Sequence, residues 1–171
     1  MNTIYHTFRA TILALSLLIS INGIAQKKVS SPRDSVSGKI GKSTITVNYG
    51  SPSVKGRKIW GDLVPYNKVW RTGANEATTF KTSQEIHVEG KALPAGTYSF
   101  FAIPTEGSWT LIFNKTANQW GAFKYDDKQD ALRVEVKTKK SATLNERLVY
   151  KINADGISLL WENMEVPVGI K

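Results

Sequence analysis

Most of this chain alternates apolar and polar side chains with a period of two. Ile45, Val47 and Tyr49 alternate with threonine and asparagine, and the same alternation returns over residues 132–137 and 147–153. Because successive side chains of a strand point to opposite faces of a sheet, this period predicts half-buried antiparallel strands.

Two segments, residues 98–103 and 109–113, are apolar on both faces of the expected strand. Such a pattern predicts central strands that are covered on both sides. Glu106-Gly107-Ser108 lies between them and predicts a short hairpin turn. Outside the strands, only residues 126–131 could form a turn of helix.

The C-terminal part predicts two further strands, 157–161 and 166–170, after a turn at Asn153-Ala154-Asp155-Gly156. Repeated short strands with frequent turns indicate an all-β fold. We therefore predict a single antiparallel β-sandwich domain, or a flattened barrel, over residues 40–171 with one long aromatic-rich loop. The polar residues 26–39 before it predict a flexible arm or an irregular edge.

The first 25 residues have the pattern of a secretory signal peptide. A positively charged start precedes an apolar run from Ala10 to Ile21, and small residues at Gly23 and Ala25 predict cleavage before Gln26. The run is shorter than the roughly 20 residues that span a bilayer. We expect an exported mature protein, periplasmic or extracellular, without a membrane span.

The net charge changes the expected partners. Lysine and arginine total 23 against 14 acidic residues, a formal charge of +9, which favours anionic partners. The cations are dispersed, and an exported protein rarely meets nucleic acid, so we expect no nucleic-acid partner. Solvated strand edges explain most of the lysines.

Several kinds of catalytic site are excluded by composition. The chain has no cysteine, and His87 is the only histidine after the signal segment. Cysteine nucleophiles and cysteine- or histidine-rich metal sites are therefore ruled out, and we expect neither a metal nor a cofactor. His87 lies between two apolar residues, which predicts a solvent-facing position on a strand and disfavours a Ser-His-Asp triad.

The segment from Arg57 to Glu76, RKIWGDLVPYNKVWRTGANE, keeps no regular period and mixes aromatic, charged and turn residues. Arginine can hold a carboxylate or phosphate through two hydrogen bonds, and an indole offers a flat face to a sugar ring. The candidate ligand-binding residues are Trp60, Trp70, Arg71, Asn75 and Glu76. The alternative is structural: Arg71 and Glu76 form an ion pair, while Trp60 and Trp70 close one end of the sandwich.

A second aromatic turn, residues 114–123, adds Trp120 to the candidates. It could equally be an ordinary loop packed by this indole. If both segments lie at one end of the sandwich, they form one cleft. Acid–base chemistry would need a facing carboxylate pair, for which Asp62, Glu76 and the aspartates of residues 126–130 are available.

Four sequence runs carry a family resemblance: GSPSVKGRKIWGDLVPYNKVWRTGANEATT (50–79), LPAGTYSFFAIP (93–104), NQWGAF (118–123) and WENMEVPV (161–168). Together they resemble domain of unknown function 2911, a family of exported bacterial proteins, chiefly from Bacteroidetes-type organisms. The resemblance implies an exported single domain and transfers no catalytic residue.

Three functions are compatible with the sequence. We favour binding of a small polar ligand, a glycan or an anion, through the 57–76 loop, because no nucleophile, metal set or cofactor loop is recognisable. The alternatives are an envelope hydrolase that uses Glu76 or Asp62 with Arg71, and a structural or assembly component of the cell envelope. The oligomeric state stays open.

Overall fold

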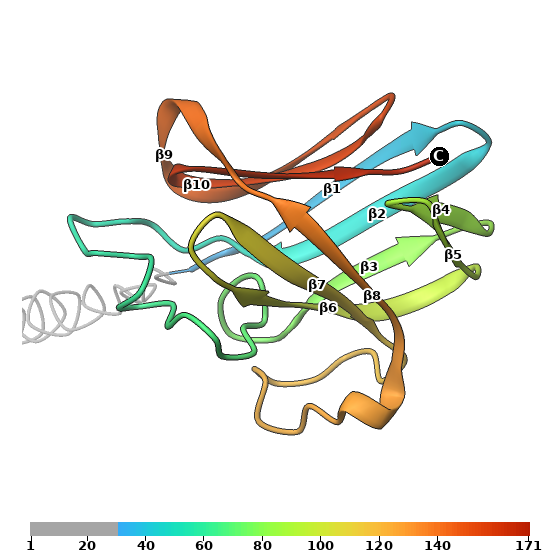
Figure 1. The fold of residues 1–171 in the computed structure, drawn as a ribbon, viewed down its shortest axis with the longest axis horizontal. Coiled ribbons are helices and arrows are strands. Elements are labelled where there is room, and N and C mark those ends of the chain that lie inside the picture. The colour runs from blue at the N-terminus through green and yellow to red at the C-terminus, as the bar shows by residue number, and fades with distance from the viewer. Residues whose placement is uncertain (1–30) are drawn as a thin grey trace, which may run out of the picture.

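The computed structural model describes residues 31–171, and nearly all of its regular structure is β-strand (Figure 1). The predicted signal peptide and the first part of the predicted arm lie outside the described residues. Within residues 31–171, helix is limited to the 3-10 turn η1 (Asp127–Gln129), inside the segment where a helical turn was expected. In this range no helix has the length and apolar character needed to cross a bilayer.

One layer is a six-stranded antiparallel sheet with the order β1-β2-β3-β6-β7-β8. Its strands are β1 (Arg33–Ile40), β2 (Ser43–Gly50), β3 (Thr78–Thr82), β6 (Gly96–Pro104), β7 (Ser108–Asn114) and β8 (Asp130–Lys137). Gly107 takes a positive φ of 87° in the β6–β7 turn, as the predicted hairpin requires.

The second layer is the antiparallel pair β9 (Lys139–Asn153) and β10 (Gly156–Gly169). A small hairpin, β4 (Ile86–Val88) and β5 (Lys91–Leu93), joins its end through a bridge between Val88 and Ile170. Figure 1 shows β9 and β10 lying over the six-stranded sheet. The sheets are antiparallel and do not close into a barrel, so the predicted all-β sandwich is confirmed.

The main core fills the space between the layers. The alternating residues Ile45, Val47 and Tyr49 of β2 are all buried, as the period of two predicts. They share this core with aromatic residues of β3, β6 and β7 and with apolar residues of β9 and β10. Burial of this apolar surface is the main stabilising term, because the chain has no disulfide.

A second, smaller core lies on the outer face of β6 and β7, which confirms that these strands are central. Phe101 and Ile112 are fully buried there with Ala77. Residues from two loops pack on them, including Val69 from the β2–β3 connection and Tyr125 from the β7–β8 connection. Parts of both connections therefore cover the outside of the sheet.

The polar N-terminal segment is more regular than predicted. Residues 33–39, part of the expected flexible arm, form β1, which pairs with β2 from Arg33 opposite Gly50 to Ile40 opposite Ser43. β1 is an edge strand whose side chains are mostly exposed. Backbone hydrogen bonds to β2 hold this strand in place. Such bonds do not depend on side-chain type, so the polar composition of the segment gives no sign of them.

The two strands predicted at the C-terminus are one strand. β10 runs without interruption through residues 156–169, with register shifts on either side of Glu162. Glu162 takes a φ of 54°, so the chain bulges and bends there while it stays paired with β9.

Candidate functional site

Four indoles form a cluster inside the sandwich. Trp60 and Trp70 come from the β2–β3 connection, Trp109 from β7 and Trp161 from β10, and all four are at most 8% exposed. Trp60 lies 4.9 Å from Trp109 and 5.8 Å from Trp70, measured between ring centroids, in edge-to-face geometry. Trp60 and Trp70 are therefore buried in the core, packed against indoles from both layers.

Hydrogen bonds on either side of Arg71 fix the position of Trp70 and Arg71. Trp70 exchanges two backbone hydrogen bonds with Ala102 of β6, at 2.7 and 2.9 Å. The Thr72 hydroxyl donates to the carbonyl of Phe100 at 2.8 Å. From the other layer, the buried Tyr150 hydroxyl donates to the carbonyl of Thr72 at 2.8 Å, and burial raises the pKa of Tyr150. Arg71 thus extends from a backbone held by both layers.

Close backbone packing holds the following turn. The amide of Ala74 donates to the carbonyl of Gly50 at 3.3 Å. A Cβ on Gly50 would lie 2.1 Å from the carbonyl oxygen of Ala74, and one on Gly73 would lie 2.9 Å from the Thr78 hydroxyl. The glycines at these two positions permit an approach that a side chain would block.

A cavity of about 210 Å³ opens beside this turn. We call it the Arg71 cavity. It is lined by Ser31, Pro52, Arg57, Leu63, Val64, Trp70, Arg71, Gly73, Ala74, Asn75 and Trp161. Of the predicted candidates, it brings together Trp70, Arg71 and Asn75, while Trp60 belongs to the indole cluster and does not line the cavity.

Arg71 is the unusual group of this cavity. Its side chain is half-buried, and its Nε has no hydrogen-bond partner among residues 31–171. Loss of hydration on burial lowers the pKa of the Arg71 guanidinium. Arginine nevertheless stays protonated at any physiological pH. The described lining of the cavity contains no carboxylate that could neutralise this positive charge.

Two further polar groups frame the cavity. The Arg57 guanidinium donates to the carbonyls of Ser53 and Val54, which fixes its orientation. Asn75 has a φ of 64°, and its amide donates to the carbonyl of Ser31 at 3.3 Å. The sequence contained Arg57 within the chosen segment but gave no sign that it would meet Arg71.

Glu76 and Trp120 lie outside the Arg71 cavity and next to each other. Their backbones form an antiparallel bridge, and both line a neighbouring hollow of about 300 Å³ on the outer face of the sheet. Glu76 is ion-paired with Arg33 at 3.7 Å, so the structural alternative in which Arg71 and Glu76 form an ion pair is wrong. The two aromatic loops meet, and Glu76 and Trp120 share this hollow, whereas Trp70, Arg71 and Asn75 line the Arg71 cavity, so the candidates do not form one cleft.

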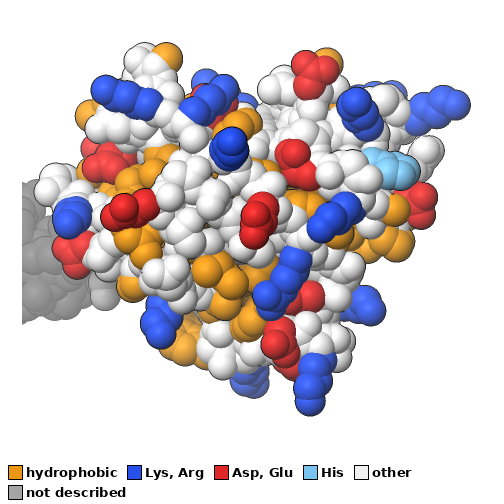
Figure 2. Space-filling model, viewed as in Figure 1, with side chains coloured by type: hydrophobic (Ala, Val, Ile, Leu, Met, Phe, Trp, Pro, Cys, Tyr) orange, Lys and Arg blue, Asp and Glu red, His pale blue; other side chains and the backbone are white. Residues whose placement is uncertain are grey.

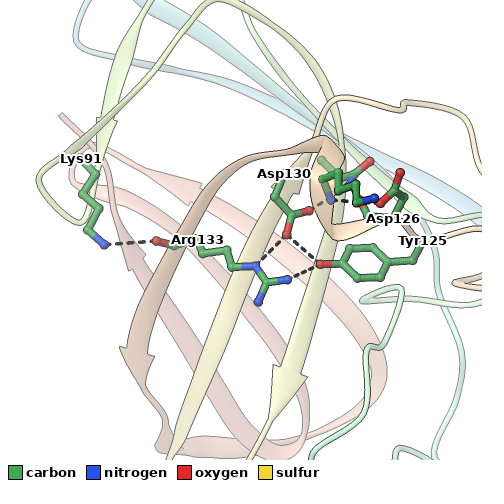
Figure 3. Close-up of polar contacts among 7 residues, drawn as sticks. Lys91, Tyr125, Asp126, Asp130 and Arg133 are labelled. Carbon is green, nitrogen blue, oxygen red and sulfur yellow. Dashed lines mark hydrogen bonds and ion pairs between the residues drawn. The ribbon is translucent and has the colours of Figure 1, made fainter.

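The remaining acidic candidates have structural positions. Asp62 is exposed in a turn. Asp126 accepts a hydrogen bond from the backbone of Lys128 and caps η1. Asp130 accepts from both Tyr125 and Arg133 at 2.7 Å (Figure 3). Within residues 31–171, no group of three or more His, Cys, Asp or Glu side chains is arranged to hold a metal ion.

Trp161 and Arg33 are site residues that the sequence did not indicate. Trp161 sits in the C-terminal strand, far along the chain from the loop whose cavity it lines. Arg33 belongs to the segment expected to be an arm. Only a tertiary contact brings either of them to the site.

Comparison with known proteins identifies the family of the chain. No curated protein and no solved structure matches the chain. One family model, described as "Protein of unknown function (DUF2911)", matches residues 31–170, which is nearly all of the described chain. The chain therefore belongs to the DUF2911 family.

Proposed function

We propose that this protein binds a small organic anion, a carboxylate with an apolar part, in the Arg71 cavity. The observation that carries the proposal is the half-buried Arg71 guanidinium with an unpartnered Nε, in a cavity whose described lining contains no acidic residue. A partly desolvated charge without a counterion is unfavourable, so proteins usually pair it. A ligand carboxylate would supply that partner through two parallel hydrogen bonds.

Part of the cavity lining is apolar and can contact the apolar part of such a ligand. Leu63 is 44% exposed, while Val64, Trp70 and Trp161 line the cavity with little exposed surface. Arg57 adds a second positive charge at the same cavity. The formal charge of +9 over the chain favours the approach of anions from a distance.

The hydrolase alternative is less well supported by this arrangement. It requires Arg71 to assist Glu76 or Asp62, but Arg71 and Glu76 line different hollows. Asp62 lies in an exposed turn and does not line the Arg71 cavity. We therefore favour binding over catalysis at this position.

We further propose that binding takes place outside the cytoplasm, because the first 25 residues have the pattern of a signal peptide. A role in envelope assembly would use the exposed surface rather than this cavity. Lysine and arginine are scattered over the face shown in Figure 2, rather than gathered into one docking patch.

A matched pair of ligands tests the proposal. Benzoate and benzamide have nearly the same shape, and only benzoate carries a negative charge. We expect benzoate to raise the melting temperature in a concentration-dependent way, because it binds the folded state alone. Benzamide should have little effect. Equal shifts with both compounds would contradict an anion site.

The Arg71→Met variant separates a binding role from a structural one. If Arg71 serves to bind a ligand, benzoate no longer raises the melting temperature of the variant, while the melting temperature of the ligand-free variant is equal to or above that of the wild type. Arg33→Met is the control, because it removes the same charge from outside the cavity. A fall of many degrees in the free Arg71→Met protein would instead assign Arg71 to the stability of the fold.

A further inference from the structure

The β7–β8 loop exposes two aromatic side chains to solvent. Trp120 is 62% exposed and Phe123 is 87% exposed. Among residues 31–171, the other large apolar side chains that are exposed are Leu63 at 44% and Leu144 at 62%. Trp120 and Phe123 lie three positions apart on one loop, and contiguous exposed apolar surface of this kind is typical of binding sites.

The loop that carries these rings is held by the main chain. The amide of Ala77 donates to the carbonyl of Gln119 at 2.8 Å, and the amide of Gly121 donates to the carbonyl of Asn75 at 3.1 Å. These bonds lie on either side of Trp120. The indole is thus exposed on a fixed backbone, which lowers the entropy lost when a ligand binds.

Side-chain networks hold both ends of the same loop. At the start, the Gln119 amide donates to the carbonyl of Thr116 at 2.7 Å and to the side chain of Asn114 at 3.3 Å. At the end, the hydroxyl of Tyr125 and the guanidinium of Arg133 both donate to Asp130 (Figure 3). The ring of Tyr125 also packs on Phe101 of the outer core.

Trp120 stands in a groove made of three adjoining hollows, of about 500, 300 and 310 Å³. We call it the outer groove. Asn118 lines all three hollows, and Trp120 lines the second and third. Phe123 and Lys124 line the far end of the third. A shallow groove of linked hollows fits a linear chain of similar units better than one compact ligand.

The polar groups of the groove are of the kind that bind hydroxyl groups. The exposed amide of Asn118 can donate and accept hydrogen bonds. Gln119, which is 6% exposed, lines two of the hollows and has an Oε1 without a partner among the described residues. The Arg33–Glu76 pair is long, at 3.7 Å, and half exposed, so both members remain available to a ligand.

We propose that the outer groove binds a linear oligosaccharide of hexopyranoses with equatorial hydroxyl groups, with one sugar ring stacked on Trp120. Such a ring presents a flat face of C–H groups with partial positive charge, and the face of an indole is partially negative. The hydroxyl rim then meets the amides and the ion pair along the groove. This site is independent of the Arg71 cavity, which has different lining residues.

Calorimetric titration of the mature protein with cellohexaose and chitohexaose tests the proposal. We expect measurable binding of at least one of them, and weaker binding of the corresponding disaccharide. Trp120→Ala should weaken binding by about tenfold or more, the equivalent of about 1.4 kcal/mol, while Trp120→Phe retains most of it. Phe123→Ala should weaken binding to a smaller extent.

Leu144→Ala is the matched control, because Leu144 is as exposed as Trp120 but lies on β9. It should bind like the wild type, as should Arg71→Met, which affects only the anion site. The proposal is overturned if neither hexasaccharide binds, or if Trp120→Ala binds as well as the wild type. It is also overturned if sedimentation shows a dimer that Trp120→Ala and Phe123→Ala dissociate, since the rings would then join two copies of the chain.

Discussion

The indole rings of Trp70 and Trp161 lie almost parallel, with centroids 6.1 Å apart and an angle of 15° between their planes. One ring comes from the β2–β3 connection and the other from β10, so this contact joins the loop to the second layer. The same two rings line the Arg71 cavity. The core and the proposed anion site therefore share a wall, and variants must be chosen to separate stability from binding.

Tryptophans in the core and on the surface should differ sharply in their effect on stability. Trp109 is 1% exposed in the indole cluster, whereas Trp120 is 62% exposed. We expect Trp109→Ala to lower the free energy of unfolding by about 3–5 kcal/mol. Trp120→Ala should change it by no more than about 0.5 kcal/mol. Urea unfolding followed by circular dichroism measures both, and similar losses in the two variants would contradict the burial assigned here.

Close contact between Gly50 and Ala74 predicts that alanine at Gly50 destabilises the fold more than alanine at Gly38. Alanine at Gly50 would place its Cβ 2.1 Å from a carbonyl oxygen, so the 71–77 turn must move. We expect Gly50→Ala to cost about 1–3 kcal/mol or more. Gly38→Ala, in the neighbouring strand, meets only side-chain atoms of Ile152, the nearest at 3.0 Å, so a shift of a few tenths of an ångström in that side chain suffices. A smaller loss for Gly38→Ala than for Gly50→Ala is the expected result of thermal unfolding.

Tyr125 should give the protein a measurable dependence on alkaline pH. Burial, followed by the hydrogen bond to Asp130, raises the pKa of Tyr125 to about 12. Because the folded pKa lies above the ordinary value of about 10, the stabilisation is complete below pH 10. It is lost as the pH rises towards 12 and the phenol ionises. The Tyr125→Phe variant should therefore lose less stability between pH 10 and 12 than the wild type. Urea unfolding at a series of pH values measures this, and midpoints that fall equally with pH in the two proteins would contradict it.

The two carboxylates Glu76 and Asp130 should differ in their contribution to stability. Glu76 is half exposed in a long pair with Arg33. Pairs of this kind contribute about 0–1 kcal/mol, so Glu76→Gln should change stability little. Asp130 is 9% exposed and accepts hydrogen bonds from Asn114, Tyr125 and Arg133.

Asp130→Asn should accordingly cost about 1.5–3 kcal/mol, because it weakens charge-assisted hydrogen bonds at a buried group. Thermal unfolding at neutral pH compares the two variants. If Glu76→Gln proved the more destabilising, Glu76 would have a structural partner stronger than Arg33.

The strands could be predicted from the sequence where the pattern of apolar and polar side chains follows their burial. Ile45, Val47 and Tyr49 are buried on alternate positions, and Phe100 and Phe101 are buried on opposite faces of β6. β1 and the middle of β10 were not predictable in this way. β1 is held by backbone pairing at an edge, and β10 continues through a bulge at Glu162, so neither keeps a clear apolar period.

The sequence by itself determined the all-β class, the central strands and the two loops in which candidate residues lie, because hydrophobic periodicity and turn residues are local properties. Tertiary structure alone decided which of these residues meet. It brought Arg71, Trp70 and Trp161 to one cavity, paired Glu76 with Arg33 rather than Arg71, and left Trp120 exposed beside a groove. These outcomes depend on contacts between segments far apart in the chain, which a local pattern does not encode.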